Sequence, residues 1–438
     1  MSTESTIAVA IDAGDLPMGG GLMALVRPAL LLLEPGGVLA INSCHDSLQD
    51  DLSVWCRIKQ HEYLGHEPAP MAGASGTTEG SGCHDSSVGK PKPTVRHLIR
   101  RGDLSVPQGS RETNMRLEAV NGRLSAEAVL SAVPMPETAD PRTGFAPRGA
   151  QVEPGGPRYP FDLLDRNHVA PPEVAKLYDQ AVESQWDGNR DIPWHKLPMH
   201  SPDLERAIGQ VFTFLAENEL SALYVPSRFV SRIHPAYAEV AMFLSTQMAD
   251  EARHIDVFLK RARSGGAGLG VSSVTTSQSL LSLLELTDFT EATFLLSVLG
   301  EGTFVDLLRF IEDHAPDDVT AEVVSRARND EARHVHFGLV HVRHALANDP
   351  GLYQRLENAV RRRAAVMAAN SGVPEPLQDG LTILAAGSTT YRDIARGHDE
   401  FRALLDEMHT NRIKRLEHAG FTSAQANTLS ELHTPNFM

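Results

Sequence analysis

The five residues Asp250-Glu251-Ala252-Arg253-His254 recur without a change as residues 330–334 of the chain. Each copy lies within a long stretch whose apolar residues repeat every three to four positions, which predicts a helix. Residues three apart share one face of a helix, so Glu251 pairs with His254 and Glu331 pairs with His334. Each pair offers a carboxylate and an imidazole to a divalent ion. Two identical copies in separate helices strongly favour a metal site.

Two further carboxylates complete the ligand set, one from each of two other predicted helices. Glu301 stands 30 residues before Glu331, in an apolar run between two glycines, and is expected to face inward. Glu219 stands 32 residues before Glu251, and Glu217 stands 34 before it. Glu219 is preferred because the small residues after it allow helices to approach closely. Glu217 remains the alternative.

An acidic residue directly precedes each ligand glutamate of the repeated motif. A metal-bound histidine usually donates its other N–H group to a carboxylate or a carbonyl. Asp330 is therefore expected to reach His254, and Asp250 is expected to reach His334. The alternative is that both aspartates are solvated helix acids. Trp186 is interpreted as the anchor of a polar loop rather than as part of a site.

The chemistry of these ligands favours iron or manganese. Four carboxylates balance the charge of two divalent ions, whereas without metal they would repel one another and some would have to protonate. Carboxylate and imidazole ligands suit iron or manganese, while structural zinc usually takes sulfur or more histidine. Two iron ions are therefore expected, with a mixed manganese–iron pair or a dimanganese pair as alternatives.

The composition divides the 438 residues into three parts, which predict a multidomain chain of class α plus α/β. Residues 1–103 have strand-like and helix-like runs in the order βαβαββ, typical of a small two-layer sandwich, with a Gly/Ser/Pro-rich insertion at about 66–92 that predicts disorder. Residues 104–158 are rich in proline and have the character of a flexible linker. Residues 159–438 show helical periodicity, interrupted by breakers such as Pro226. The expected helical segments are about 171–185, 203–226, 236–264, 278–313, 318–347, 351–370 and 397–418.

The bulk composition excludes several classes of function. Lys plus Arg is 40 and Asp plus Glu is 56, a balance of −16, so neither nucleic acid nor an anionic membrane is an expected partner. The longest uninterrupted apolar run, 364–369, is far below the roughly 20 residues of a membrane span. Three cysteines, none in a Cys-x-x-Cys motif, exclude a thiolate zinc ribbon and fit a reducing, cytoplasmic location.

The ligand candidates are Glu219, Glu251-x-x-His254, Glu301 and Glu331-x-x-His334. With this set, the segment of about residues 160–350 resembles the ferritin-like di-iron carboxylate superfamily of oxidases and oxygenases. The resemblance implies a four-helix bundle, here with extra helices, around a dimetal centre that reacts with O2. It implies a non-haem oxidoreductase that acts on a small organic substrate. Whether the chain forms a homodimer stays open. Electrons are expected from a separate reductase or ferredoxin, because no Gly-x-Gly-x-x-Gly motif follows a strand. Ala327 stands where one N-oxygenase pattern has an additional histidine.

A second resemblance concerns about residues 5–65 and 93–102, which are similar to the TusA-type sulfur-carrier fold. The resemblance rests on Ile11-Asp12, Leu16-Pro17-Met18-Gly19, Met23-Ala24, Trp55-Cys56 and residues 61–64. That family carries sulfur on a cysteine at the start of its first helix, where this chain has Met18. Methionine cannot accept a persulfide, so this domain is expected to dock a partner or to cover the site.

Other functions stay open from the sequence. A non-enzymatic iron-binding, storage or ferroxidase-type protein would use the same bundle, and a sulfur-relay accessory protein would use the first domain. The helices after residue 350 and about 160 residues before the bundle favour an enzyme with its own substrate pocket. A purely structural bundle would leave Glu219 and Glu301 exposed.

Overall fold

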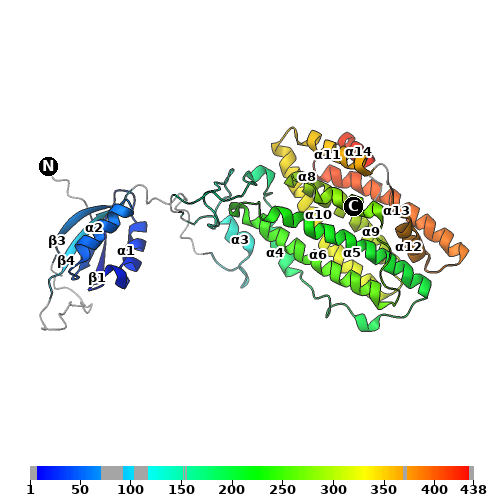
Figure 1. Cartoon of the computed structure of the whole chain (residues 1–438), viewed down its shortest axis with the longest axis horizontal. Coiled ribbons are helices and arrows are strands. Elements are labelled where there is room, and N and C mark those ends of the chain that lie inside the picture. The colour runs from blue at the N-terminus through cyan, green and yellow to red at the C-terminus, as the bar shows by residue number, and fades with distance from the viewer. Residues whose placement is uncertain are drawn as a thin grey trace. The chain divides into compact units, whose positions relative to one another are not determined.

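The computed structural model describes residues 7–70, 92–102, 117–150, 152, 155–367 and 372–433. The chain forms two compact units: Met1–Glu112 with Gly149–Gly156, and Thr113–Arg148 with Pro157–Met438. The first unit contains a four-stranded sheet and the second is helical (Figure 1). Among the helices of the described ranges, none combines the length and the apolar character needed to span a bilayer.

The first unit has the expected order of strands and helices. Its elements are β1 (Ile7–Gly14), α1 (Leu22–Leu31), β2 (Val38–Ser43), α2 (Leu48–Ile58), β3 (Glu62–Pro68) and β4 (Val95–Arg100). The strands lie in the order β1-β2-β4-β3, with β1 parallel to β2 and the other neighbours antiparallel. Both helices bury apolar side chains against the sheet, among them Val26 of α1 and Leu52 of α2, which share a core with Ile41 of β2. The likeness to a sulfur carrier stays a prediction.

Two details of the first unit differ from the sequence interpretation. Residues 66–68 of the expected disordered insertion belong to β3, because they pair with β4 from His66↔His97 to Pro68↔Val95. Residues 71–91 of that insertion lie outside the described residues. Cys44 takes part in a disulfide, whereas the cysteine content favoured reduced thiols. The cytoplasmic location therefore stays a prediction.

The second unit is built around four long helical segments. Its helices are α3 (Ala126–Ser131), α4 (Val174–Glu183), α5 (Pro202–Val230), α6 (Ala238–Ser264), α7 (Val274–Leu284), α8 (Phe289–Thr293), the π-helical η6 (Phe294–Glu301), α9 (Gly302–Asp313), α10 (Asp318–Asn348), α11 (Leu352–Met367), α12 (Glu375–Ala386), α13 (Tyr391–His418) and α14 (Ser423–Leu432). The helix α5 packs on α6, the continuous segment α8–η6–α9 packs on α10, and α6 contacts α10 (Figure 1). The later helices α12 and α13 cover α5 and α9.

The helices differ from the periodicity in several respects. Pro226 was expected to end a helix but lies inside α5, which continues to Val230. A proline removes one backbone hydrogen bond and bends a helix without always ending it. The segment 278–313 is divided, because Asp288 caps a new helix by accepting a hydrogen bond from the Glu291 backbone. The short helices α12 and α14 were not expected.

Part of the segment expected to be a linker is packed against the bundle. The side chain of Arg148 forms a buried ion pair with Glu239 of α6. The same guanidinium donates to the backbone carbonyls of Leu130, Val133 and Ala236. One arginine thus fastens residues 130–148 to α6, which a proline-rich composition does not reveal. Residues 103–116 of the expected linker lie outside the described residues.

Candidate metal centre

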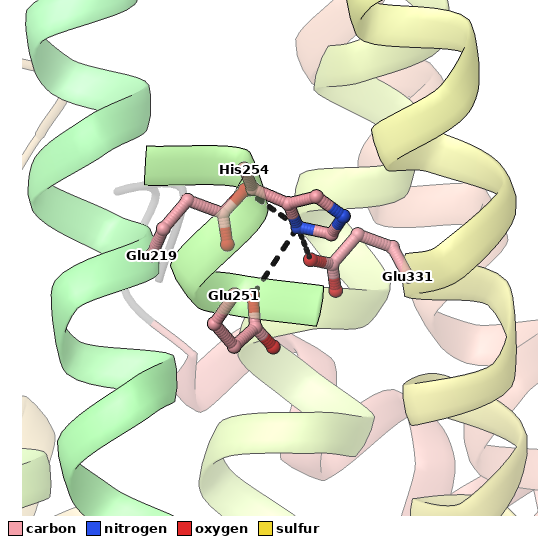
Figure 2. A group of neighbouring side chains, drawn as sticks. All are labelled: Glu219, Glu251, His254 and Glu331. Carbon is pink, nitrogen blue, oxygen red and sulfur yellow. Dashed lines mark ion pairs between the residues drawn. The ribbon is translucent and has the colours of Figure 1, made fainter. Parts of the chain in front are cut away.

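Four helical segments bring the six expected ligand residues together. Glu219 comes from α5, Glu251 and His254 from α6, Glu301 from the end of η6, and Glu331 and His334 from α10. Each of the six is at most 1% exposed. Figure 2 shows four of them, Glu219, Glu251, His254 and Glu331, pointing toward one another from three helices.

The six residues form two overlapping groups, in each of which the candidate ligand atoms lie within 4.8 Å of one another. The first group is Glu219, Glu251, His254 and Glu331, and the second is Glu251, Glu301, Glu331 and His334. The carboxylates of Glu251 and Glu331 belong to both groups. Two shared carboxylates with one carboxylate and one imidazole at each end can hold two adjacent metal ions.

The unpaired polar atoms of this cluster test whether metal ions fit. Eight buried oxygen and nitrogen atoms of the six residues have no hydrogen-bond partner: Glu219 Oε1, both oxygens of Glu251 and of Glu331, Glu301 Oε2, and the Nδ1 atoms of His254 and His334. All of them except Glu301 Oε2 take part in carboxylate–imidazole ion pairs of 3.0–3.5 Å. Buried polar atoms without hydrogen bonds are nevertheless unfavourable in an apolar interior. A pair of divalent ions would coordinate them, and the oxygen and imidazole donors suit iron or manganese.

The far side of each imidazole contacts the aspartate of the opposite motif. His254 Nε2 lies 3.2 Å from Asp330 Oδ2, and His334 Nε2 lies 3.3 Å from Asp250 Oδ2. Burial disfavours ionisation of Asp330, but His254, Arg333 and Trp186 together outweigh burial and hold its pKa well below its usual value. An ionised aspartate only accepts, so each Nε2 is the donor and each Nδ1 faces the cluster. This is the crosswise arrangement expected from the sequence.

Two arginines close a ring of charges around these aspartates. Arg253 Nη2 lies 3.1 Å from Asp330 Oδ2 and also pairs with Asp250. Arg333 Nη2 lies 3.2 Å from Asp250 Oδ2 and also pairs with Asp330. The two guanidinium charges balance the two carboxylate charges. The aspartates therefore stay ionised next to a cluster that is already rich in carboxylates.

Trp186 also belongs to the surroundings of the site, contrary to its interpretation as a loop anchor. Its indole Nε1 donates a hydrogen bond of 2.8 Å to Asp330 Oδ2, and its ring stacks on His254 with centroids 6.4 Å apart. The guanidinium carbon of Arg253 lies 4.7 Å from the ring centroid. Trp186 lies just beyond the end of α4, so no helical periodicity predicted the direction of its side chain.

Glu301 is held by two residues that the sequence did not single out. Gln247 Nε2 donates to Glu301 Oε1 at 2.9 Å, and the side chain of Ser297 also hydrogen-bonds Glu301. Gln247 precedes Glu251 by one helical turn, which is the signal that could have identified it. Ser297 lies in η6, and single π-helical turns often mark functional sites. Gly338 of α10 permits the close approach, because a Cβ there would lie 2.7 Å from Ser297 Cβ.

The alternative ligand Glu217 does not reach the cluster. Within the described residues it belongs to neither of the two ligand groups. Its side chain is half-buried and hydrogen-bonds Ser272, and burial raises its pKa. The structure therefore favours Glu219 over Glu217.

The electrostatics of the cluster favour four bound protons when no metal is present. Burial, reinforced by neighbouring glutamates, raises the pKa of Glu219 and of Glu301 well above its usual value. Burial disfavours protonation of His254 and His334, but the surrounding carboxylates together outweigh burial and raise each pKa well above its usual value. The strongest of these carboxylates is Glu219 for His254 and Glu251 for His334. Two divalent ions carry the same total charge as the four protons they would displace.

We therefore expect metal loading to release protons. Because the pKa values of these four groups are raised, addition of ferrous or manganous ions should release protons as the ions take their place. The apparent metal affinity should fall as the pH is lowered, because protons compete for the same atoms. A pH-stat titration under anaerobic conditions measures the release. Glu217→Gln should leave it unchanged, and release of fewer than about one proton would contradict the expectation.

An apolar cavity adjoins the end of the cluster that contains Glu301. Gln247 and Ser297 form its polar wall. The other lining residues are Val225, Pro226, Phe229, Leu244, Phe289, Ala292, Thr293, Leu296 and Phe337. The free volume of about 10 Å³ is room for one molecule the size of water.

Comparisons with known proteins give matches among solved structures. No protein-family model matches the chain, and no curated protein does. A tyrosine-to-phenylalanine variant of an R2-like ligand-binding oxidase with an aerobically reconstituted Mn/Fe cofactor is 18% identical, with 56% of this chain and 92% of that chain covered and a TM-score of 0.43. A glycine-to-phenylalanine variant, also with the Mn/Fe cofactor, is 19% identical, with 56% and 96% covered and a TM-score of 0.43.

Proposed function

We propose that the chain is a dimetal oxidase or oxygenase that binds two iron ions, or one manganese and one iron ion, and activates O2. The observation that carries this proposal is the pair of ligand groups that share Glu251 and Glu331. The eight buried ligand atoms without hydrogen bonds support it, because the buried polar atoms of a purely structural cluster would be hydrogen-bonded. When bound, the metal pair supplies the redox chemistry for O2 reduction.

The residues around the ligands have separate tasks in this proposal. The crosswise aspartates fix each imidazole with Nδ1 toward the metals. Gln247 and Ser297 restrict the orientation of Glu301, the carboxylate nearest the cavity. The apolar lining of the cavity excludes bulk water from that side, so that reactive species are not quenched by solvent.

The cavity supports O2 as one substrate and an apolar organic molecule as the other. At its present volume it admits a diatomic molecule, and a larger substrate requires side chains such as Phe337 or Leu296 to move. The small volume also favours a second candidate, a ferroxidase, since oxidation of ferrous iron needs no organic pocket. A separate electron donor and a docking role for the first unit complete the proposal.

Sulfur relay has little support. Met18 replaces the sulfur-carrying residue of the family that the first unit resembles. Cys56 is free but buried, and burial raises its pKa to about 12. A thiol that stays protonated is a poor nucleophile.

Oxygen uptake by the reduced, iron-loaded protein tests the proposal. We expect uptake to slow about tenfold in Leu296→Phe, which fills the cavity, at unchanged iron content. Leu220→Phe on the exposed face of α5 is the matched control. Uptake that equals the rate of free ferrous iron contradicts an oxidase. Repeated oxidation and release of excess added iron would favour the ferroxidase.

A further inference from the structure

The helix α7 carries a stripe of apolar side chains that stay exposed within the described part of the chain. Val274 is 68% exposed, Leu281 is 53% exposed and Leu284 is 39% exposed. Together with the exposed Ser277 they are spaced three, four and three residues apart, so they share one face of the helix. Leu283 faces the other way and is fully buried in the core. We call the four exposed residues the α7 stripe.

The apolar surface continues beside the α7 stripe. On α5, against which α7 packs, the side chain of Glu217 hydrogen-bonds Ser272 just before α7. Tyr224 follows Glu217 by two helical turns on the same face of α5 and is 57% exposed, and Val271 is 61% exposed. A helix of 11 residues is about 16 Å long and about 10 Å wide. The stripe alone is therefore much smaller than the about 800 Å² per partner of a standard interface, and these neighbours enlarge it.

The charges of the chain indicate which partner fits this surface. With 40 basic and 56 acidic residues, two copies of the chain repel each other over most of their surfaces. Residues 265–284 contain no Asp, Glu, Lys, Arg or His and form the longest such stretch of the chain. A membrane surface would require basic residues at the contact. A second copy of this chain can approach here without bringing like charges together.

The spacing of the α7 stripe also fits its own copy. Intervals of three, four and three residues read the same in both directions along the helix. In an antiparallel pair of α7 helices related by a two-fold axis, Val274 therefore faces Leu284 of the second copy while Ser277 faces its Leu281. The small Ser277 leaves room for the larger leucine. A two-fold interface requires a surface that is complementary to itself in this way.

We propose that the chain forms a two-fold symmetric dimer in which α7 packs antiparallel against α7 of a second copy. Tyr224 and Val271 lie at the rim of this interface. The residues involved belong to neither of the two ligand groups. The dimer is therefore independent of the function proposed above.

Sedimentation velocity of the metal-loaded full chain over a range of concentrations tests this surface. We expect the mass to rise with concentration to that of two chains, and the dimer to become tighter at higher salt, which screens the repulsion between acidic copies. Leu281→Glu should weaken the dimer at least 100-fold, because it places unpaired carboxylates in the contact. Val182→Glu adds the same charge to α4, at a side chain that is 50% exposed. This control should change the dissociation constant by less than about threefold.

A charge pair tests the antiparallel register. Leu284→Glu should weaken the dimer about tenfold, and adding Val274→Lys should restore it, because the two new charges face each other across the two copies. Within one helix these positions are about 15 Å apart, too far to form an ion pair. Adding Val274→Glu instead should weaken the dimer further.

A dimer that persists in Leu281→Glu would overturn the proposal, because the contact would then lie on another surface. A parent chain that stays monomeric up to about 100 µM would overturn it as well. In that case, a lower free energy of unfolding in Leu281→Glu would assign the stripe to another part of the same chain. An unchanged free energy of unfolding would assign it to a different protein.

Discussion

Replacing Glu251 with glutamine should abolish binding of both metal ions, whereas replacing Glu219 should weaken only one of the two sites. Glu251 belongs to both ligand groups and Glu219 to one. A neutral amide removes the shared negative charge, and we expect at least a 100-fold loss of affinity at both positions. Metal per chain, measured by plasma mass spectrometry after anaerobic loading and gel filtration, should fall from about two to none in Glu251→Gln.

Glu217→Gln is the matched control, since it lies two residues from Glu219 on the same helix and outside both groups. It should retain about two ions per chain. Glutamine in place of a buried carboxylate removes charge repulsion, so the variants should stay folded without metal, which circular dichroism can verify. Two ions retained by Glu251→Gln, or metal lost from Glu217→Gln, would refute the arrangement of ligands.

Replacing Arg148 with methionine should destabilise the helical unit by about 3–5 kcal/mol. The change leaves the carboxylate of Glu239, itself 2% exposed, buried without its cation. It also removes the donors to the carbonyls that fasten residues 130–148. Urea denaturation of the metal-free protein, followed by circular dichroism, measures the free energy of unfolding.

The exposed residue Arg142 provides the control, and Arg142→Met should change the free energy of unfolding by less than about 0.5 kcal/mol. The double variant Arg148→Met, Glu239→Met should recover part of the loss, because no buried charge is then left alone. A loss below about 1 kcal/mol in the single Arg148 variant would favour a flexible linker after all.

The sequence predicted that these six residues would lie together, because most of them obey helical spacing. The repeated motif places Glu251 with His254 on one helix face, and this needs no knowledge of tertiary structure. Glu301 was recognisable as a carboxylate in an apolar run. Glu219 could be separated from Glu217 only by the small residues after it, and the structure supplies the stronger argument.

The residues around the ligands could not be predicted in the same way. Trp186 lies in a loop, where no period fixes the direction of a side chain. The π-helical turns of η6 leave no mark on the apolar pattern, since every residue of that run except Ser297 and Glu301 is apolar or glycine. Arg148 looks like any arginine of a proline-rich segment until its contacts are known. For Trp186 and Arg148, contacts with residues distant in the sequence decide where the side chain lies.

The distribution of the ligands over the chain has a consequence for the order of folding. The pair α5–α6 is one helical hairpin, and η6–α9 with α10 is a second. The first ligand group takes Glu331 from the second hairpin, and the second group takes Glu251 from the first. A folding intermediate with only one hairpin formed can therefore complete neither group. Metal binding during folding would then report the docking of the two hairpins. We expect this docking to be late, because it requires the closure of a long loop.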